Sequence, residues 1–510
     1  VFLTKKNTPM SSILKYKKLV THFDKALRDR LVSDSKYARL IISCHLREEL
    51  LFLPRSLTSE DKIKIIDNYI DSGSANINIL RSIITFPPDK GLSIPDNTKL
   101  KAKRTATEEE KYIIEKGSGF DMQVLVSFST DQVDTVSIDW DNKTSTIKIN
   151  KKWIEDNKDY PTLWNNFIYL LGYVDKQNRV GFVSKKNESS VFEYALMPSE
   201  DYLYLRNIAF NHKEMVYDTL THGYIKVLNN YSVRLEHMIE WFFEVYIKEH
   251  FKITNFVVKM PSEYASYFEK CRTILPEIDR IFKQYSSLIE NGMIDQELIQ
   301  MSSSSTKFND IRSMNAKKYV YASSRWINNA SHLLFSDQSR IVYIPKIEDN
   351  YENFYHLIKS ENVEFSDFND YQQNILQWLL ENRLIAKSNS NQIIIHDTNL
   401  VNLLYDLYKN EVISYWHLSG EHQNIIERLY SENHVRFGTT LLSEPESDYF
   451  DYYLNKSKFT NGYELRNKYL HGTNTNEEAQ HKIDYFLILK LLIIIVLKIN
   501  DDLDINDLYK

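Results

Sequence analysis

The chain has 510 residues, of which 43% are hydrophobic and 13% aromatic, so it can form large cores and is not a disordered polymer. Its net charge of −6 argues against a protein that coats nucleic acid over its whole surface and confines any RNA contact to a local patch. The two cysteines, Cys44 and Cys271, argue against a disulfide framework and favour the reducing cytoplasm. No Cys/His pattern has zinc spacing, and we expect no cofactor.

The first third of the chain is predicted to be helical and to end in a small β region. The chain contains only 12 Gly and 11 Pro, which favours helices over tight turns. Apolar residues recur at helical spacing over residues 10–86, and Phe86-Pro87-Pro88 should stop that region. Residues 87–118, which include a basic run from Lys99 to Arg104, are expected to form a solvated loop that enters a helix. Alternating residues over 121–150 predict a β hairpin or small sheet.

The middle of the chain is predicted to hold a helical regulatory region and a winged-helix-like segment. Aromatic helices extend from Trp153 to about residue 300, and the serine-rich stretch 301–306 is a linker candidate. Residues 366–413 have the order helix, hairpin, helix, which is typical of a winged helix. In the hairpin and the helix after it Lys387 is nearly alone as a basic residue, and that helix carries Asp406. We therefore expect this segment to dock on a partner rather than on DNA.

The end of the chain is predicted to be a helical bundle. Helices are expected from Glu421 to Asn433, from Glu444 to Leu454, and from about Glu478 to Asn500. The last of these is strongly apolar, but its apolar stretch is shorter than a bilayer span and contains Lys490, so a buried bundle helix or a dimer seam is favoured over a membrane segment. The four aspartates between residues 501 and 507 are expected to form a solvated tail.

A short helix before this apolar helix carries the residues with the clearest chemistry. Asn461 and Glu464 have the spacing of a capping box, so we expect a helix from Asn461 to His471 that ends at Gly472. Arg466 and His471 lie inside it. A histidine that moves a proton beside an arginine that stabilises phosphoryl charge is what cleavage of RNA by its own 2′-OH requires.

The spacing between this arginine and histidine is not specific by itself. It recurs elsewhere in the chain, for example in the pairs Arg206/His212, Arg325/His332 and Arg428/His434. Only the pair Arg466/His471 has flanking Leu and Asn residues, a His-Gly end and a long apolar helix after it. Arg206 and His212 form the second, lower-ranked candidate motif, and the other two pairs are treated as chance matches.

The stretch from Leu465 to Gly472, LRNKYLHG, resembles the Arg-x(4–6)-His signature of the HEPN superfamily. The resemblance is sharp over about ten residues and looser over residues 443–499. Some HEPN toxins have a tyrosine two residues after the histidine, whereas this chain has Thr473. HEPN domains are small helical bundles that dimerise, and many are metal-independent endoribonucleases.

The resemblance implies that Arg466 and His471 are catalytic and that Asn467 and Glu464 orient them. It also implies an RNA substrate, a 2′,3′-cyclic phosphate product and a homodimer that pools two Arg/His sets. By analogy with the family, the protein would be a regulated bacterial anti-phage or abortive-infection toxin, with a phage-derived or protein trigger and no membrane association.

Together these features predict a mainly α protein with five regions. They are an N-terminal helical region (1–88), a linker with the β region (89–160), a helical regulatory or sensor region (161–300), a linker with the winged-helix-like segment (301–420), and a HEPN-like helical domain (421–510). Two alternatives remain open. One is an inactive HEPN-type module that binds RNA or protein, in which Arg466 and His471 pair with carboxylates or cap carbonyls. The other is a winged-helix DNA-binding regulator.

Overall fold

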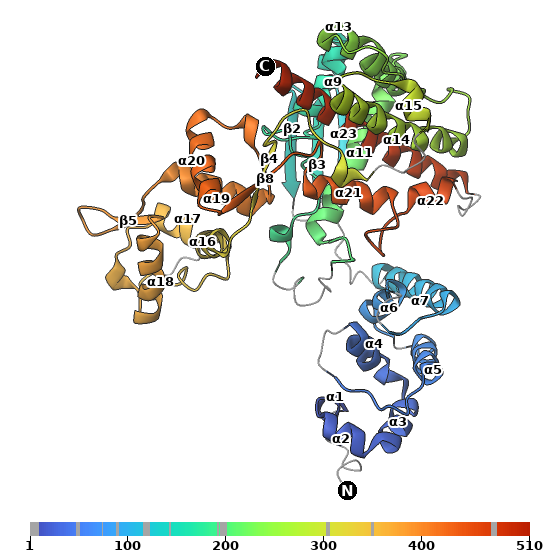
Figure 1. Ribbon diagram of the computed structural model, residues 1–510, viewed down its shortest axis with the longest axis vertical. Coiled ribbons are helices and arrows are strands. Elements are labelled where there is room, and N and C mark those ends of the chain that lie inside the picture. The colour runs from blue at the N-terminus through green and yellow to red at the C-terminus, as the bar shows by residue number, and fades with distance from the viewer. Residues whose placement is uncertain are drawn as a thin grey trace. The chain divides into compact units, whose positions relative to one another are not determined.

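The computed structural model describes residues 10–46, 51–73, 75–87, 91–115, 123–141, 144–190, 193, 201–301, 307–347, 351–470 and 477–509. The chain is mainly helical with a few small sheets, as predicted (Figure 1). It divides into two compact units. Residues 1–123 with 200–203 form the first unit, and residues 124–199 with 204–510 form the second.

The first unit is a set of helices around one apolar core, as the helical spacing of residues 10–86 predicts. Its elements are α1 (Met10–Leu14), α2 (Lys17–His22), α3 (Asp24–Val32), η1 (Ser35–Tyr37), α4 (Ala38–Leu46), α5 (Ser59–Ile70), α6 (Ile77–Ile84) and α7 (Asp96–Glu115). A capping box between Thr58 and Asp61 starts α5.

The basic run from Lys99 to Arg104 lies inside α7 and not in a loop, so that prediction is wrong. Ala102 and Ala106 of this helix are buried in the core of the first unit. Lys99 donates to the carbonyl of Phe86 at 2.7 Å, and Lys101 pairs with Asp71 at 2.6 Å. Small residues at helical spacing supplied the buried face, and they gave a weaker sequence signal than the charges around them.

The second unit contains two cores, and the larger one combines a three-stranded sheet with helices from both halves of the chain. Its elements before residue 311 are β1 (Gln123–Ser129), β2 (Val136–Asp141), β3 (Thr144–Asn150), α8 (Lys151–Asp156), α9 (Tyr160–Tyr169), η2 (Lys186–Glu188), α11 (Ile208–Asn230), α12 (Leu235–Trp241), the π-helical turn η3 (Phe242–Tyr246), α13 (Ile247–Phe251), α14 (Tyr267–Asn291), α15 (Gln296–Met301) and η4 (Phe308–Asp310). Its elements after residue 440 are α21 (Glu444–Leu454), α22 (Leu465–Leu470) and α23 (Glu478–Leu508).

This larger core joins two regions that the sequence analysis had separated. One continuous cluster of buried residues extends over 147–311 and again over 441–503. The helices predicted as a regulatory region therefore pack directly on the helices predicted as a HEPN-like domain. Sequence separation hid this arrangement, because an inserted segment of more than a hundred residues lies between the two halves of the core.

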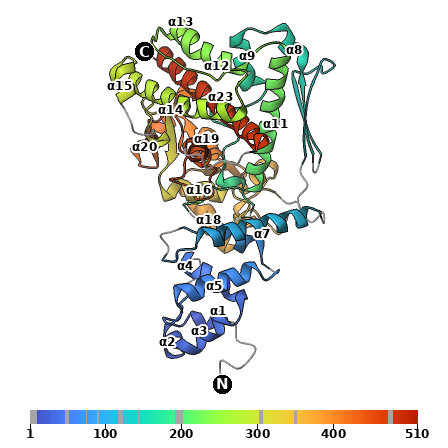
Figure 2. The same cartoon turned by 90° about the vertical axis from the view of Figure 1, so that its right-hand side faces the viewer.

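The sheet of this core has the strand order β1-β3-β2, and β2 pairs antiparallel with β3. It stands beside α11 (Figure 2). Gly223 of α11 faces β1, since a Cβ atom there would lie 2.8 Å from the ring of Phe128. The predicted turn at 142–143 lies outside the described residues.

Helix α23 passes between the other helices of the larger core (Figure 2) and is buried on all sides over most of its length. Lys490 in its middle is fully buried and contacts Glu214 at 2.9 Å and Asp218 at 2.6 Å, both on α11. Among the described residues, no helix is long and apolar enough to cross a membrane. The apolar stretch of α23 instead fills the interior of this core.

Of the four aspartates at the end of the chain only Asp507 is exposed, and all four belong to a helix, so the prediction of a solvated tail is wrong. Helix α23 continues to Leu508, past the predicted end at Asn500. Asp502 is fully buried and accepts from Lys318 at 2.5 Å and from the Ser313 hydroxyl at 2.5 Å. A buried lysine far away in sequence makes this burial possible, because it compensates the charge.

The smaller core of the second unit is made from the inserted segment (Figure 1). Its elements are β4 (Tyr319–Ala322), α16 (Arg325–Phe335), α17 (Phe354–Ser360), η5 (Phe365–Asp367), α18 (Asp370–Glu381), β5 (Ile385–Lys387), β6 (Ile393–Ile395), α19 (Thr398–Asn410), β7 (Ile413–Ser414), η6 (Tyr415–His417), α20 (Gly420–Ser431) and β8 (Val435–Gly438).

This segment contains the same motif twice, with an offset of 50 residues. Helix α18 spans 370–381 and α20 spans 420–431, while η5 and η6 precede them at 365–367 and 415–417. After each helix a residue has a left-handed backbone, Arg383 in the first copy and Asn433 in the second. Strands β5 and β8 follow, starting at residues 385 and 435.

The two copies also share their sheet order but not the source of the middle strand. In the first copy, β6 lies between β5 and the backbone at residues 363–364. In the second copy, β4 occupies that place between β7 and β8, although it comes from before both copies. Helix α20 therefore belongs to this smaller core, through Ile426 and Leu429, and not to the bundle in which the sequence analysis placed it.

Candidate functional site

Helix α22 carries the Arg466 motif, and it begins later than predicted. Glu464 has a left-handed backbone with φ of 55°, so the helix starts at Leu465. Asn461 is not its N-cap, and the predicted capping box is wrong. Instead the Asn461 amide pairs with the backbone of Tyr204, accepting from its N–H and donating to its carbonyl at 2.9 Å each. The turn before α22 is tight, since a Cβ atom on Gly462 would lie 2.7 Å from the carbonyl oxygen of Tyr452.

One face of α22 is anchored in the larger core through Leu465 and Tyr469, which are both buried. The Tyr469 hydroxyl donates to Asp484 Oδ2 at 2.8 Å and contacts His481 Nδ1 at 2.8 Å, both on α23. Burial raises the pKa of this phenol, and the neighbouring carboxylate adds to the shift. The phenol is therefore a neutral hydrogen-bonding group that fixes α22 on α23.

Arg466 lies on α22 with only 8% of its side chain exposed. Its Nη2 donates to Asp279 of α14, and its Nη1 donates to Asn455 Oδ1 at 2.9 Å. The guanidinium also lies over the ring of Phe308, 5.0 Å from the centroid. Its Nε is buried and has no acceptor among the described residues.

The charge of Arg466 is therefore compensated by a carboxylate inside the protein. Burial lowers the pKa of the guanidinium, and the carboxylates of Asp279 and Asp451 oppose that shift. The group remains a cation because an arginine pKa is so high in water. A phosphate that used this cation would have to share it with Asp279 or displace it.

The other predicted site residues are distributed around α22. Asn467 is half-buried and has an interaction partner, and Glu464 pairs with Lys456 at 3.6 Å. His471, with Gly472 and Thr473, lies outside the described residues. The structure thus places Arg466, Asn467 and Glu464 on or next to one short helix.

The two residues of the second candidate motif, Arg206 and His212, make hydrogen bonds with different residues. Arg206 is exposed and donates to Asn211 Oδ1 at 3.3 Å. His212 contacts the Ser145 hydroxyl of β3 at 2.8 Å, and burial lowers its pKa. These hydrogen bonds of Arg206 and His212 therefore go to different residues.

The sequence analysis missed the residues that hold the motif in place. Asp279 is 187 positions away from Arg466, so no local pattern could have paired them. His481 and Asp484 are three residues apart on α23 and therefore share a face. This spacing can be seen in the sequence, but it does not show that both side chains contact Tyr469.

In the part of the chain that the structure describes, no three His, Cys, Asp or Glu side chains group as ligands for a metal ion. No family model, curated protein or solved structure matches the chain. Any function must therefore be inferred from the residues around α22.

Proposed function

We propose that the protein is a metal-independent endoribonuclease of the HEPN type. The observation that carries this proposal is the LRNKYLHG sequence, whose first six residues form a short helix that is fixed against a long buried helix, with the arginine held by a carboxylate. We further propose that the protein acts in the bacterial cytoplasm as a regulated anti-phage toxin, with a homodimer as the active form.

The proposed reaction is an attack of the RNA 2′-OH on its own phosphodiester. His471 takes the proton from the 2′-OH as the 2′-oxygen bonds to phosphorus. An acid, such as His471 of the partner subunit, gives a proton to the departing 5′-oxygen. Arg466 stabilises the charge on the phosphoryl oxygens. The products carry a 2′,3′-cyclic phosphate and a 5′-OH.

The pairing of Arg466 with Asp279 fits a resting state of such an enzyme. A free ribonuclease damages its host, so a cation that is neutralised until RNA or a trigger arrives is a plausible safeguard. The exposed fraction of the Asp279 side chain is 22%, compared with 8% for Arg466. The carboxylate is thus the more accessible partner and the one that can move away.

The same ion pair supports a second candidate, an inactive HEPN-type module that binds RNA or a protein. In that case Arg466 holds α14 and α22 together and never meets a phosphate. A buried arginine–carboxylate pair is common as a purely structural contact, and the geometry of the resting pair is the same in both cases.

Incubating the purified protein with labelled RNA in the presence of a chelator separates the two candidates. The proposal predicts cleavage to 2′,3′-cyclic phosphate and 5′-OH ends, and a loss of roughly a hundredfold or more for Arg466→Lys, which keeps the charge but loses the planar fork. A strict requirement for Mg²⁺ would contradict the mechanism. The inactive module would be favoured if the wild type and Arg466→Lys both bind RNA without cutting it. The protein purified from phage-infected cells should then also leave the RNA intact.

A further inference from the structure

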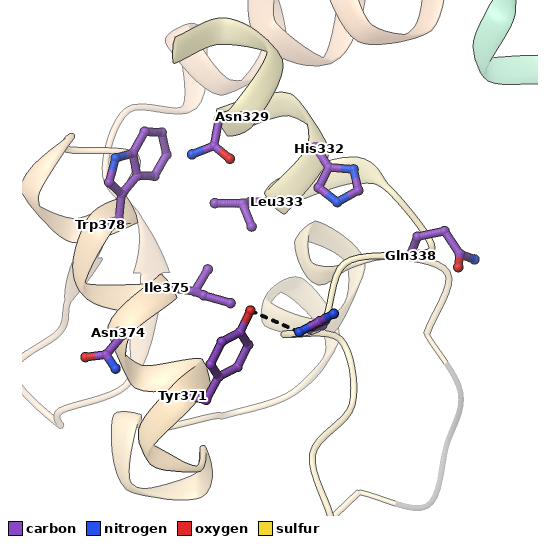
Figure 3. A pocket seen from close by; sticks show the side chains of 9 residues that line it. Asn329, His332, Leu333, Gln338, Tyr371, Asn374, Ile375 and Trp378 are labelled. Atoms are coloured by element: carbon purple, nitrogen blue, oxygen red, sulfur yellow. Dashed lines mark hydrogen bonds between the residues drawn. The ribbon is translucent and has the colours of Figure 1, made fainter. Parts of the chain in front are cut away.

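The inserted segment contains a groove that the proposed cleavage chemistry does not use. It lies between α16 and α18 and has a volume of about 470 Å³, within the range of small-ligand sites. Figure 3 shows Leu333 of α16 and Ile375 of α18 at its centre. Tyr371 and Trp378 lie on either side of Ile375 along α18. Tyr371 is 55% exposed, so a large part of its ring is available to a ligand. The groove thus has an apolar floor with an aromatic residue towards each end.

The polar groups of the groove include three carboxamides, one guanidinium and one imidazole. Asn329, Gln338 and Asn374 contribute carboxamides, and Arg340 and His332 contribute nitrogen groups. None of the described residues that line it is a carboxylate. This is unusual for its surroundings, because residues 319–440 contain nine Lys and Arg against fifteen Asp and Glu. The lining therefore suits a ligand that is planar and carries an anionic group.

The cation of the groove is held in place by its neighbours. Gln372 is buried and donates to the carbonyls of both Arg340 and Tyr343 at 2.8 Å, which fixes this backbone on the start of α18. The Arg340 side chain donates to the Tyr371 hydroxyl at 3.1 Å and lies over its ring. Among the described residues, that hydroxyl is the one hydrogen-bond acceptor of the Arg340 side chain. Its other N–H groups remain available to an anion.

The second copy of the repeat shows that the fold does not require these aromatic residues. Positions 371 and 378 of α18 correspond to Glu421 and Arg428 of α20, whereas Ile375 corresponds to Ile425. The apolar position is kept because it packs inside each copy. The two aromatic positions are charged in the second copy, so their side chains in the first copy are free to serve another purpose.

We propose that the groove between α16 and α18 binds a nucleotide, with the base against Tyr371 and Trp378 and the phosphate at Arg340. Bases of any sequence stack on aromatic side chains, and Asn and Gln carboxamides match the hydrogen-bonding edges of bases. The guanidinium suits a phosphate oxygen pair. The nucleotide is either part of a single RNA strand or a free nucleotide, and both present the same chemistry to these residues.

Two probes distinguish these sources in the full-length protein. The first is a short fluorescent 2′-O-methyl oligoribonucleotide of mixed sequence, followed by anisotropy. It has no free 2′-OH and cannot be cut by the proposed reaction, so binding here is measured independently of cleavage. The second is each of the four nucleoside 5′-monophosphates, followed by calorimetry. A strand site predicts that the oligonucleotide binds roughly tenfold or more tightly than any monophosphate, and a free-nucleotide site predicts that one monophosphate equals or exceeds it.

In either case Arg340→Ala and Tyr371→Ala should each weaken binding about tenfold, whereas Arg428→Ala on α20 should leave it unchanged. Arg340, Tyr371 and Arg428 are all exposed, so the three variants are matched and should keep the fold. The proposal is overturned if no probe binds below ~1 mM. It is also overturned if a probe binds and both groove variants bind it as Arg428→Ala does.

Discussion

Helices α22 and α23 both carry buried cations, but the partners of these cations differ. Lys490 of α23 lies between two carboxylates, and Lys498 pairs with Glu446 at 3.0 Å and donates to a backbone carbonyl at 2.7 Å. Arg466 of α22 has one carboxylate, one amide and a buried Nε without an acceptor among the described residues. We call the two buried lysines of α23 fully compensated, because each has a carboxylate and a second acceptor. We call Arg466 partly compensated, because its charge is paired but its Nε lacks an acceptor among the described residues.

This difference matches the proposal that Arg466 has a chemical role, whereas the buried lysines of α23 have a structural one. Burial lowers the pKa of the Lys490 ammonium, but Glu214 and Asp218 outweigh that effect and raise it overall. Such a group only fixes how α23 sits on α11. A cation with unused hydrogen-bonding capacity, on a short helix that precedes His471, is instead suited to a second partner such as a phosphate.

Removal of a fully compensated cation should give the largest loss of stability. Lys490→Met leaves Glu214 buried without its counter-charge, and we expect a loss of about 3–5 kcal/mol in the free energy of unfolding. Urea denaturation followed by circular dichroism measures it. Lys482→Met, at an exposed position of the same helix, should change stability by less than about 0.5 kcal/mol. Equal effects of the two substitutions would show that the Lys490 ion pairs do not stabilise the fold.

Neutralising Asp279, the partner of Arg466, should lower stability less than Lys490→Met does, and it should raise the rate of RNA cleavage. For Asp279→Asn we expect a loss of about 1–3 kcal/mol, because a hydrogen bond remains possible. RNA cleavage should become faster, since Arg466 is no longer held by a carboxylate. Glu290→Gln, exposed on α14, is the matched control. Slower cleavage by Asp279→Asn would mean that Asp279 positions Arg466 and does not restrain it.

A fourth cation, Lys185, extends the comparison to a neutral partner. Lys185 donates to the Asn410 amide at 2.8 Å, and burial lowers its pKa to about 8. The unfolded chain, with a lysine pKa near 10.4, therefore binds more protons between these values, and stability should rise with pH through that window. The gain should be about 1 kcal/mol between pH 7 and pH 9, and Lys185→Met should abolish it. A wild-type stability that stays level over this range would contradict the lowered pKa.

The sequence predicted the elements of this protein better than their partners. A proline suited to a first helical turn placed α21 at Glu444–Leu454, and a polar turn between two apolar runs placed the hairpin of residues 385–395. Both predictions are correct because those signals are local. The sequence could not show that Asp502 meets Lys318 or that Asp279 meets Arg466, since each pair is joined only by the fold. The errors at α7 and at the start of α22 have local causes. At α7 the charges indicated a loop, whereas buried alanines form the inner face of a helix. At α22 the spacing of Asn461 and Glu464 predicted a capping box, whereas Glu464 has a left-handed backbone and the helix begins after it.

The most direct test of the account is the rate of RNA cleavage by His471→Ala. The matched control is His396→Ala, which changes an exposed histidine outside the motif. Both proteins should unfold at the wild-type midpoint. The account predicts that His471→Ala lowers the cleavage rate by roughly a hundredfold or more, while His396→Ala cleaves as the wild type does. Equal rates for the two variants would contradict the account and leave Arg466 with a structural role alone.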